Sequence, residues 1–478
     1  MRLIEVCAAF ARGGVIGGQV LRTMTAHYLK AAGRWLALPF ALGSGVIAAW
    51  AGWTYEQALM AGILVMAAVL WVTEAVPLFV TSVLVIGAEV ILLANPGRWP
   101  FFGYATGDGP GFASILNAAV SPTLVLFFAG LVMARAAVKE GVDQAMGGWL
   151  LRPFVHSRRL LLFGVMGVTA LFSMWMSNTA TTAFMLTLTM PLLAQVAPAD
   201  PYRRALLLAV PFAANIGGLG TPIASPPNAI ALGYLRSVNE RLGFLEWMMA
   251  AVPLMIVLLA FLGWLLLRLF PSSSGQPLGL TLPVVSLGRR SRWVVGIFTV
   301  TVILWMSEGL HGLPASVVAL LPVLALLLGG FIDRDDVNHL EWDVLMLIGG
   351  GMALGYGVGV TGLDHRIVAL LPSAGGMVGL IAVLVLATYI LSTLLSNSAV
   401  ANLLLPIGLA AVAGGGQVTP ALVAIALAAS LAMALPVSTP PNAMAYARGE
   451  LRSSDMAKAG IPVGLVGLGL ILAFLILR

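Results

Sequence analysis

The sequence is poor in charge and almost free of cysteine. Only 9% of its 478 residues are Asp, Glu, Lys or Arg, whereas a soluble globular domain carries about a quarter. Cys7 is the single cysteine, which excludes an intramolecular disulfide. The sequence contains no Walker A loop or dinucleotide fingerprint. In a chain with so few charges, a net charge of +6 is weak evidence for nucleic acid, and we expect no nucleic-acid partner.

Hydrophobic residues, in contrast, make up 60% of the chain. Apolar runs near twenty residues recur along its length, and the short alternating segments of a β-barrel are absent. These features predict an all-α polytopic membrane protein in contact with lipid. We expect eleven spans, at about 35–54, 57–73, 76–94, 120–138, 203–235, 247–269, 293–309, 314–332, 343–361, 420–449 and 459–477.

Two further apolar segments, 159–196 and 375–412, are too long for one straight crossing. Each is interrupted by a polar cluster, SNTAT at 177–181 and SNSAV at 396–400. Non-helical backbone at membrane depth is tolerated only inside protein or against a water-filled cavity. We interpret each segment as a re-entrant hairpin of two half-helices with its polar cluster at the tip.

The distribution of basic residues predicts the orientation in the membrane. If the N-terminus is cytoplasmic, 20 of the 25 Lys and Arg residues fall on the inner side, as the positive-inside rule requires. We expect a multi-pass protein of the cell (inner) membrane. We also expect the basic segment 1–34 to be an uncleaved cytoplasmic segment on the membrane surface, with a cleaved signal or transit peptide as the alternative.

Four motifs recur in the same order in the two halves of the chain. WVTEAVP (71–77) pairs with WMSEGLHGLP (305–314), FAGLVMARAAVKEGVD with IGGGMALGYGVGVTGLD, SNTAT with SNSAV, and ASPPNAIA with STPPNAMA. The predicted organisation is a first transmembrane helix at 35–56, a repeat at 57–270, a cytoplasmic linker at 271–292 and a second repeat at 293–478. Five crossings separate equivalent positions, so the second repeat is inverted. Inverted repeats with broken helices are typical of secondary transporters, whose site lies between the repeats.

Each half also contains a Pro-Pro-Asn segment inside an apolar span, at 203–235 and 420–449. Two prolines in a row disfavour a continuous helix, so we expect unwinding at 216–228 and at about 434–442. Unwound backbone supplies carbonyls for a cation and helix N-termini for an anion. Neither hairpin tip nor either Pro-Pro-Asn loop contains Lys, Arg or His. A bound anion would therefore depend on neutral donors, helix dipoles and co-bound cations, which would couple the two ligands.

These polar residues also have a structural interpretation, because Ser, Thr and Asn in membrane helices often bond across a helix interface. Two clusters at matching places, each followed by Pro-Pro-Asn, favour a site instead. The sequence leaves the roles of three acidic residues open. Glu74 and Glu308 lie near the ends of repeat-related spans, where a helix-end role is the alternative to a functional one. Glu89 lies within a span and fits either an interfacial residue or a buried structural pair.

The motifs resemble those of the divalent anion/sodium symporter family, the sodium-coupled dicarboxylate, citrate and sulfate transporters. The resemblance covers about residues 35–478. It implies an elevator-type transporter, in which hairpins and broken helices slide against a scaffold that forms a homodimer. It also implies that the chain is not an enzyme, that its ligands are small dicarboxylates such as succinate, malate or fumarate, and that transported sodium ions take the place of any organic cofactor.

The resemblance further implies two sets of site residues. The sodium ligands would be Ser173, Ser177, Asn178 and the backbone near Ala224 in one half, and Ser392, Asn397 and the backbone near Ser438 in the other. The substrate would meet Asn178, Thr179, Asn397 and Ser398, with Ser225 and Thr439 nearby.

The sequence departs from the family where Ser398 and Val400 replace threonines and where Ala224-Ser225 replaces Gly-Thr. It leaves symport and sodium-independent exchange open. A cation/proton antiporter would need a buried titrating acid, and neither hairpin nor either Pro-Pro-Asn loop contains Asp or Glu. An intramembrane hydrolase would need His or Asp there to activate a serine.

Overall fold

The computed structural model describes residues 15–102, 104, 109–273, 286–370, 376–412 and 417–477. All secondary structure in these ranges is helical. Seven of the described helices are long and apolar enough to cross a membrane, and four shorter apolar helices accompany them. The fold therefore agrees with the predicted all-α membrane protein. The middle of the predicted linker, 274–285, lies outside the described residues.

The helices of the first half begin with a long N-terminal helix and end before the linker. They are α2 (Val15–Trp50), α3 (Tyr55–Thr73), α4 (Leu78–Ala88) with a π-turn at Glu89–Leu93, α5 (Phe112–Ala119), α6 (Pro122–Lys139), α7 (Val142–Leu151) followed by a 3-10 turn (Arg152–Phe154), α8 (Arg158–Ser173), α9 (Asn178–Ala194), α10 (Tyr202–Gly217), α11 (Pro226–Ser237) and α12 (Phe244–Leu269).

The second half repeats much of this order. Its helices are α13 (Arg289–Met306), α14 (Glu308–His311), α15 (Ala315–Val318), α16 (Leu320–Leu328), α17 (Arg334–Asn338), α18 (Trp342–Val360), α19 (Leu363–Leu370), α20 (Gly376–Leu394), α21 (Asn397–Val412), α22 (Val418–Ser430), α23 (Pro440–Tyr446) and α24 (Ser453–Leu477).

Some predicted boundaries differ from the observed helix ends. Helix α2 runs without interruption from Val15 to Trp50, so no helix end separates the predicted surface segment 1–34 from the first span. The predicted span 120–138 corresponds to α6, which begins at Pro122 directly after α5. Proline is favoured in the first turn of a helix, where its missing amide costs nothing. The position of Pro122 therefore determines where α6 begins.

The two segments that were too long for one crossing form helical hairpins. Helices α8 and α9 contact each other and are joined at residues 174–177, and α20 and α21 contact each other and are joined at residues 395–396. In the first hairpin the Ser177 hydroxyl accepts a hydrogen bond from the amide of Ala180, which caps α9. Each polar cluster therefore begins the second helix of its hairpin.

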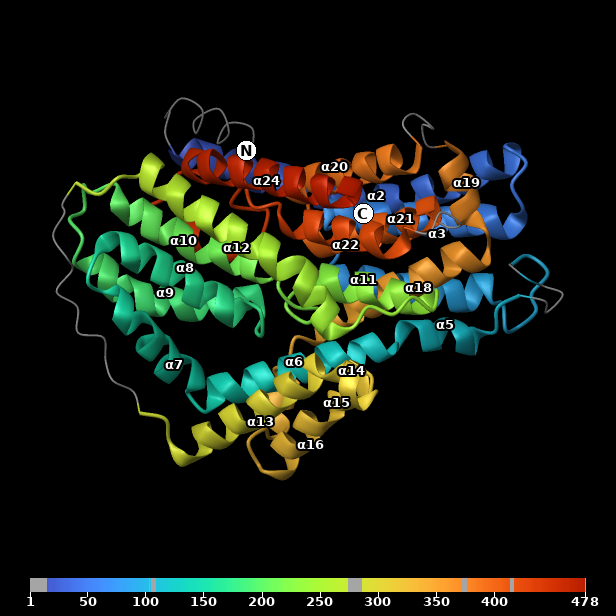
Figure 1. Cartoon of the computed structure of the whole chain (residues 1–478). Coiled ribbons are helices and arrows are strands. Elements are labelled where there is room, and N and C mark those ends of the chain that lie inside the picture. The colour runs from blue at the N-terminus through green and yellow to red at the C-terminus, as the bar shows by residue number, and fades with distance from the viewer. Residues whose placement is uncertain are drawn as a thin grey trace.

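The two Pro-Pro-Asn segments follow breaks in the helices. Helix α10 ends at Gly217 and α11 begins at Pro226, while α22 ends at Ser430 and α23 begins at Pro440. Helix α10 contacts α23, and α11 contacts α22, so each broken helix crosses the other one near its break. Figure 1 shows α11 and α22 side by side near the middle of the molecule.

Each break is closed by the asparagine of its Pro-Pro-Asn motif. The Asn228 amide nitrogen donates to the carbonyls of Gly218 and Thr221, both at 2.9 Å. Both asparagines, Asn228 and Asn442, are fully buried. Unpaired buried carbonyls are costly, so these side chains satisfy carbonyls that the break leaves without a helical partner. The sequence indicated the breaks but not this role of the asparagines.

Helices α13, α15 and α16 form a layer against α6 on one side of the molecule (Figure 1). An ion-pair cluster joins this layer at the ends of α6 and α17. Lys139 contacts Asp333 at 2.8 Å and also Asp336, which accepts from the Arg135 guanidinium at 2.9 Å. The hydrogen bond from Lys139 lowers the pKa of Asp333 to about 2.

Candidate functional site

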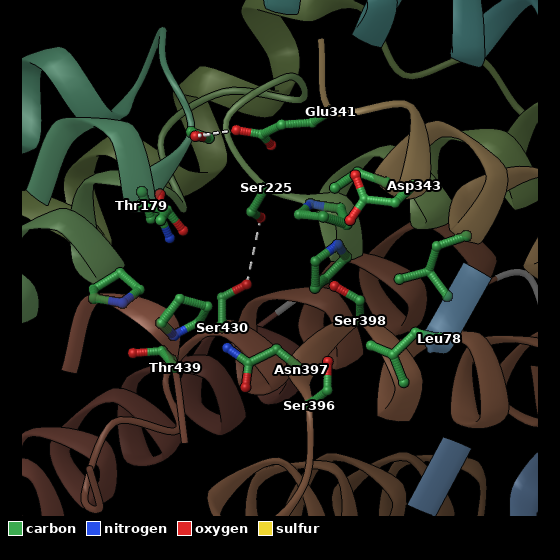
Figure 2. Close-up of a pocket in the computed structure, with 18 of the residues that line it drawn as sticks. Leu78, Thr179, Ser225, Glu341, Asp343, Ser396, Asn397, Ser398, Ser430 and Thr439 are labelled. Atoms are coloured by element: carbon green, nitrogen blue, oxygen red, sulfur yellow. Dashed lines mark hydrogen bonds between the residues drawn. The ribbon is translucent and has the colours of Figure 1, made fainter. Parts of the chain in front are cut away.

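One cavity of about 640 Å³ lies where the hairpin tips and the helix breaks meet. Figure 2 shows Ser225 and Glu341 on one side of this space and Asn397 and Ser398 on the other. Of the residues named from the sequence, the cavity is lined by Ser177, Asn178, Thr179, Ala224, Ser225, Asn397, Ser398, Ser438 and Thr439. Residues more than 200 positions apart in the chain therefore share one lining.

Ser173 lies behind the first tip and does not line the cavity. Its fully buried hydroxyl is 2.7 Å from Asn178 Oδ1 and 2.7 Å from the carbonyl oxygen of Ala214. A hydroxyl has a single proton, so only one of these two contacts is a hydrogen bond at any moment. Three oxygen atoms thus converge with one proton between them, an arrangement that suits a small hard cation.

Ser392 lies at the corresponding place behind the second tip. Its hydroxyl is fully buried, and neither it nor Asn397 Oδ1 has a hydrogen-bond partner among the described residues. Ser438 nearby donates to the carbonyl of Thr393 at 2.8 Å. Buried polar atoms are almost always paired in folded proteins. The unpaired oxygens of Ser392 and Asn397 therefore have the capacity to bind a small hard cation.

The cavity also has acidic residues that sequence analysis missed. Glu341 and Asp343, at the start of α18, line it together with Glu74. Ser177 at the first hairpin tip donates to Glu341 at 2.8 Å, across 164 residues of sequence. The sequence-based argument against an acid near the site considered only the hairpins and the Pro-Pro-Asn loops, so it did not include these carboxylates. No sequence signal connects α18 with the first hairpin, because only the tertiary fold brings them together.

Two further lining residues, Asn215 and Ser430, lie at the ends of α10 and α22. Asn215 donates to Thr439 in the other half at 3.1 Å. Ser430 lies 3.5 Å from the Ser225 hydroxyl, also in the other half (Figure 2). These contacts join the two breaks across the centre of the molecule. Asn215 lies 13 residues before Asn228 and Ser430 lies 12 residues before Asn442, so the two positions are not equivalent in the repeated motifs and no shared sequence signal marks them.

The three acids that the sequence left open have different surroundings. Glu74 ends α3 with a positive φ of 46° and pairs with Lys30 at 3.7 Å, both about half exposed. Glu89 begins the π-turn, is fully buried, and has no hydrogen-bond partner for either carboxylate oxygen among the described residues. It is therefore neither interfacial nor part of an ion pair with a described residue. One carboxylate oxygen of Glu308 is buried and has no hydrogen-bond partner among the described residues. Glu308 does not line the cavity at the hairpin tips.

A multi-pass helical fold with two hairpins and two broken helices around one central cavity defines a secondary transporter rather than an enzyme. The family model for citrate transporters matches residues 68–417 and 302–478. This chain belongs to the citrate transporter family. That membership agrees with the resemblance to sodium-coupled anion transporters found in the motifs.

Individual relatives support the same family. The chain is 31% identical over 423 residues to an uncharacterized transporter of Haemophilus influenzae, covering 84% of this chain and 87% of the relative. It is 30% identical over 440 residues to the sodium-dependent dicarboxylate transporter SdcS of Staphylococcus saprophyticus, covering 83% and 81%. An uncharacterized transporter of Schizosaccharomyces pombe is 30% identical over 439 residues, and this chain spans about half (49%) of its length.

Among solved structures, the YdaH transporter of Alcanivorax borkumensis has a similar fold. The TM-score is 0.54 at 15% sequence identity, over 83% of this chain and 96% of that one. At this identity the likeness concerns the fold alone.

Proposed function

We propose that this protein is a sodium-coupled symporter of C4-dicarboxylates such as succinate, malate and fumarate, which works by an elevator mechanism. In this proposal the two hairpins and the two broken helices move together with the bound ions against α6, α13 and α18. The working unit is a homodimer in the cell (inner) membrane with a cytoplasmic N-terminus.

The observation that carries this proposal is the lining of the cavity. Both hairpin tips and both helix breaks contribute hydroxyl and amide groups to one space of about 640 Å³, a size typical of small-molecule sites. Asn178, Asn397 and Ser398 are neutral donors that suit carboxylate oxygens. In this proposal a four-carbon dianion touches both halves at once.

The charges around the cavity support coupling to a cation. Among the described residues, the lining has Glu74, Glu341 and Asp343 but no Lys, Arg or His. An anion placed there is repelled unless cations are bound with it. The oxygen atoms around Ser173 and the unpaired oxygens of Ser392 and Asn397 are the places where sodium would bind. Sodium binding would therefore create the site for the anion.

The names of the relatives support the same reading. The Staphylococcus saprophyticus relative is a sodium-dependent dicarboxylate transporter, and the family model is that of citrate transporters. The choice of dicarboxylate over citrate rests on the first of these. Sodium-independent exchange on the same fold is the alternative outcome of the test.

The test is uptake of radiolabelled succinate into liposomes that contain the purified protein. We expect uptake into empty liposomes when an inward sodium gradient is present, and little when choline or potassium replaces sodium. Competition with unlabelled citrate and sulfate ranks the anions. Uptake that needs internal succinate and ignores sodium would establish exchange, and uptake of citrate alone would replace the dicarboxylate.

A further inference from the structure

At the second helix break, backbone carbonyls determine which side-chain atoms donate and which accept in a series of connected hydrogen bonds. The Asn442 amide nitrogen donates to the carbonyls of Met433 at 2.7 Å and Leu435 at 2.9 Å. Carbonyls only accept, so the other side-chain atom, Asn442 Oδ1, must be the oxygen. Asn215 lies 3.2 Å from this oxygen. The atom of Asn215 in this contact must therefore be its amide nitrogen.

The same nitrogen of Asn215 lies 3.1 Å from the Thr439 hydroxyl. This hydroxyl also accepts from the backbone amide of Asn442 at 3.3 Å. A hydroxyl oxygen has two lone pairs and one proton, so both acceptor positions of Thr439 are filled. The hydroxyl of Thr439 can therefore make a further hydrogen bond only by donating its proton. Thr439 lines the cavity, and the buried side chain of Asn215 is 1% exposed, which holds this arrangement away from competing water.

We propose that Asn215 is a positioning residue for the anion: it makes the Thr439 hydroxyl an obligate hydrogen-bond donor toward a carboxylate in the cavity. This inference rests on the proposed function, and it assigns one end of the dicarboxylate to the second helix break. Asn215 acts through Thr439, because its amide nitrogen is occupied by Thr439 and Asn442.

The first helix break lacks this device although its backbone is the same. Ser225 and Thr439 both have φ −145° and ψ 149°. The contact to Ser225 from the other half comes from Ser430, which has a hydroxyl and no side-chain amide. Asn228 Oδ1 is buried without a hydrogen-bond partner among the described residues. The Ser225 hydroxyl accepts no capping bond and lies 3.5 Å from Ser430, so its proton is free to turn.

The cavity therefore combines one donor of fixed direction, Thr439, with one adjustable hydroxyl, Ser225. The fixed donor holds one carboxylate of the anion. The adjustable hydroxyl accommodates ligands that differ at the other end. This asymmetry follows from the side-chain amide of Asn215, which Ser430 lacks, and from the capping bond that Thr439 accepts and Ser225 does not.

The test is a double-mutant cycle with succinate as the probe, measured by its dissociation constant for purified protein in saturating sodium. We expect Thr439→Ala to weaken succinate binding roughly tenfold or more, since it removes a hydrogen bond to a charged group. Asn215→Ser should weaken it by up to the same factor, because the Thr439 hydroxyl is then no longer held as a donor. In the Thr439→Ala background, Asn215→Ser should cost less than about twofold more. The stabilisation of the protein by sodium should be retained in both variants.

Asn402→Ser is the matched control, because Asn402 is a fully buried asparagine that donates to the carbonyl of Leu347 and lies outside the cavity lining. Its succinate affinity should equal that of the wild type. If Asn215→Ser is not monodisperse, Asn215→Asp takes its place in the cycle, because it keeps the volume and reverses the polarity of the contacting atom.

Additive losses in the cycle, or an Asn215 variant with wild-type affinity, would overturn the inference and leave the proposed function standing. Wild-type protein that binds no succinate in sodium would overturn the proposed function itself. The two failures are therefore distinguishable.

Discussion

Replacing Ser392 with alanine tests whether this serine binds sodium or only stabilises the fold. The Ser392 hydroxyl is fully buried and has no hydrogen-bond partner among the described residues. Leaving a buried hydroxyl unpaired costs about 1–3 kcal/mol. Ser392→Ala removes this cost and little volume. We therefore expect the sodium-free variant to be as stable as the wild type or more stable, by up to about that amount.

In sodium the sign of the effect reverses. A ligand at one hundred times its dissociation constant stabilises the folded protein by about 2.7 kcal/mol, and a tenfold weaker affinity reduces this to about 1.4 kcal/mol. The loss of one oxygen ligand at Ser392 should therefore remove about half of the stabilisation by sodium. Ser392→Ala should show a smaller rise in unfolding temperature on adding sodium.

The measurement is thermal unfolding of purified protein in sodium chloride and in choline chloride at equal ionic strength. Thr388→Val is the control, because Thr388 is also fully buried on α20 but its hydroxyl donates to the carbonyl of Leu384 at 2.6 Å. It should lose stability equally in both salts. If Ser392→Ala behaves in the same way as Thr388→Val, Ser392 is structural and the second sodium site is wrong.

Three further predictions concern the anion, the first hairpin and the ion-pair cluster. Ser398→Ala should weaken succinate binding by about 1.5–3 kcal/mol, the cost of a hydrogen bond to a charged group, while Ser398→Thr should be tolerated. Asn178→Asp should reduce succinate uptake in a protein that still folds, because it adds a negative charge at the anion site. The pKa of Asp333 is lowered by Lys139 to about 2. Its contribution to stability is therefore complete above about pH 4, and unfolding measurements should show it disappearing as the pH falls toward 2.

Each of these has an outcome that would contradict it. Unchanged succinate affinity in Ser398→Ala, together with its loss in Thr179→Ala, would confine the anion to the first hairpin. Undiminished uptake by a well-folded Asn178→Asp protein would remove Asn178 from the substrate site. An Asp333→Asn variant with the same acid sensitivity as the wild type would show that Asp333 does not contribute.

Much of the site was accessible from the sequence because the motifs are duplicated. The clusters around Asn178 and Asn397 and the two Pro-Pro-Asn segments were recognised together, and the structure places them around one cavity. Such clusters are easy to recognise because adjacent Ser, Thr and Asn residues are unusual in an apolar span. Their assigned roles in binding sodium and the anion stay predictions.

The acids at the start of α18 were not accessible in this way. Glu341 and Asp343 belong to no motif, and their position beside Ser177 depends on how α18 packs against the first hairpin. The direction of the hydrogen bonds from Asn215 to Asn442 and Thr439 could not be predicted from the sequence either. It depends on distances of 3.1–3.2 Å between groups that lie over 200 residues apart in the chain.

By itself, the sequence determined that the chain is an all-helical membrane protein, that its motifs recur in two halves of the chain, and where its helices break. These properties follow from local chemistry: apolar length sets the spans, and paired prolines remove the amides that a helix needs. Only the tertiary structure decided which oxygens are left without a proton or a partner at Ser173 and Ser392. Hydrogen-bond pairing is a property of distances between segments, and no pattern along the chain contains those distances.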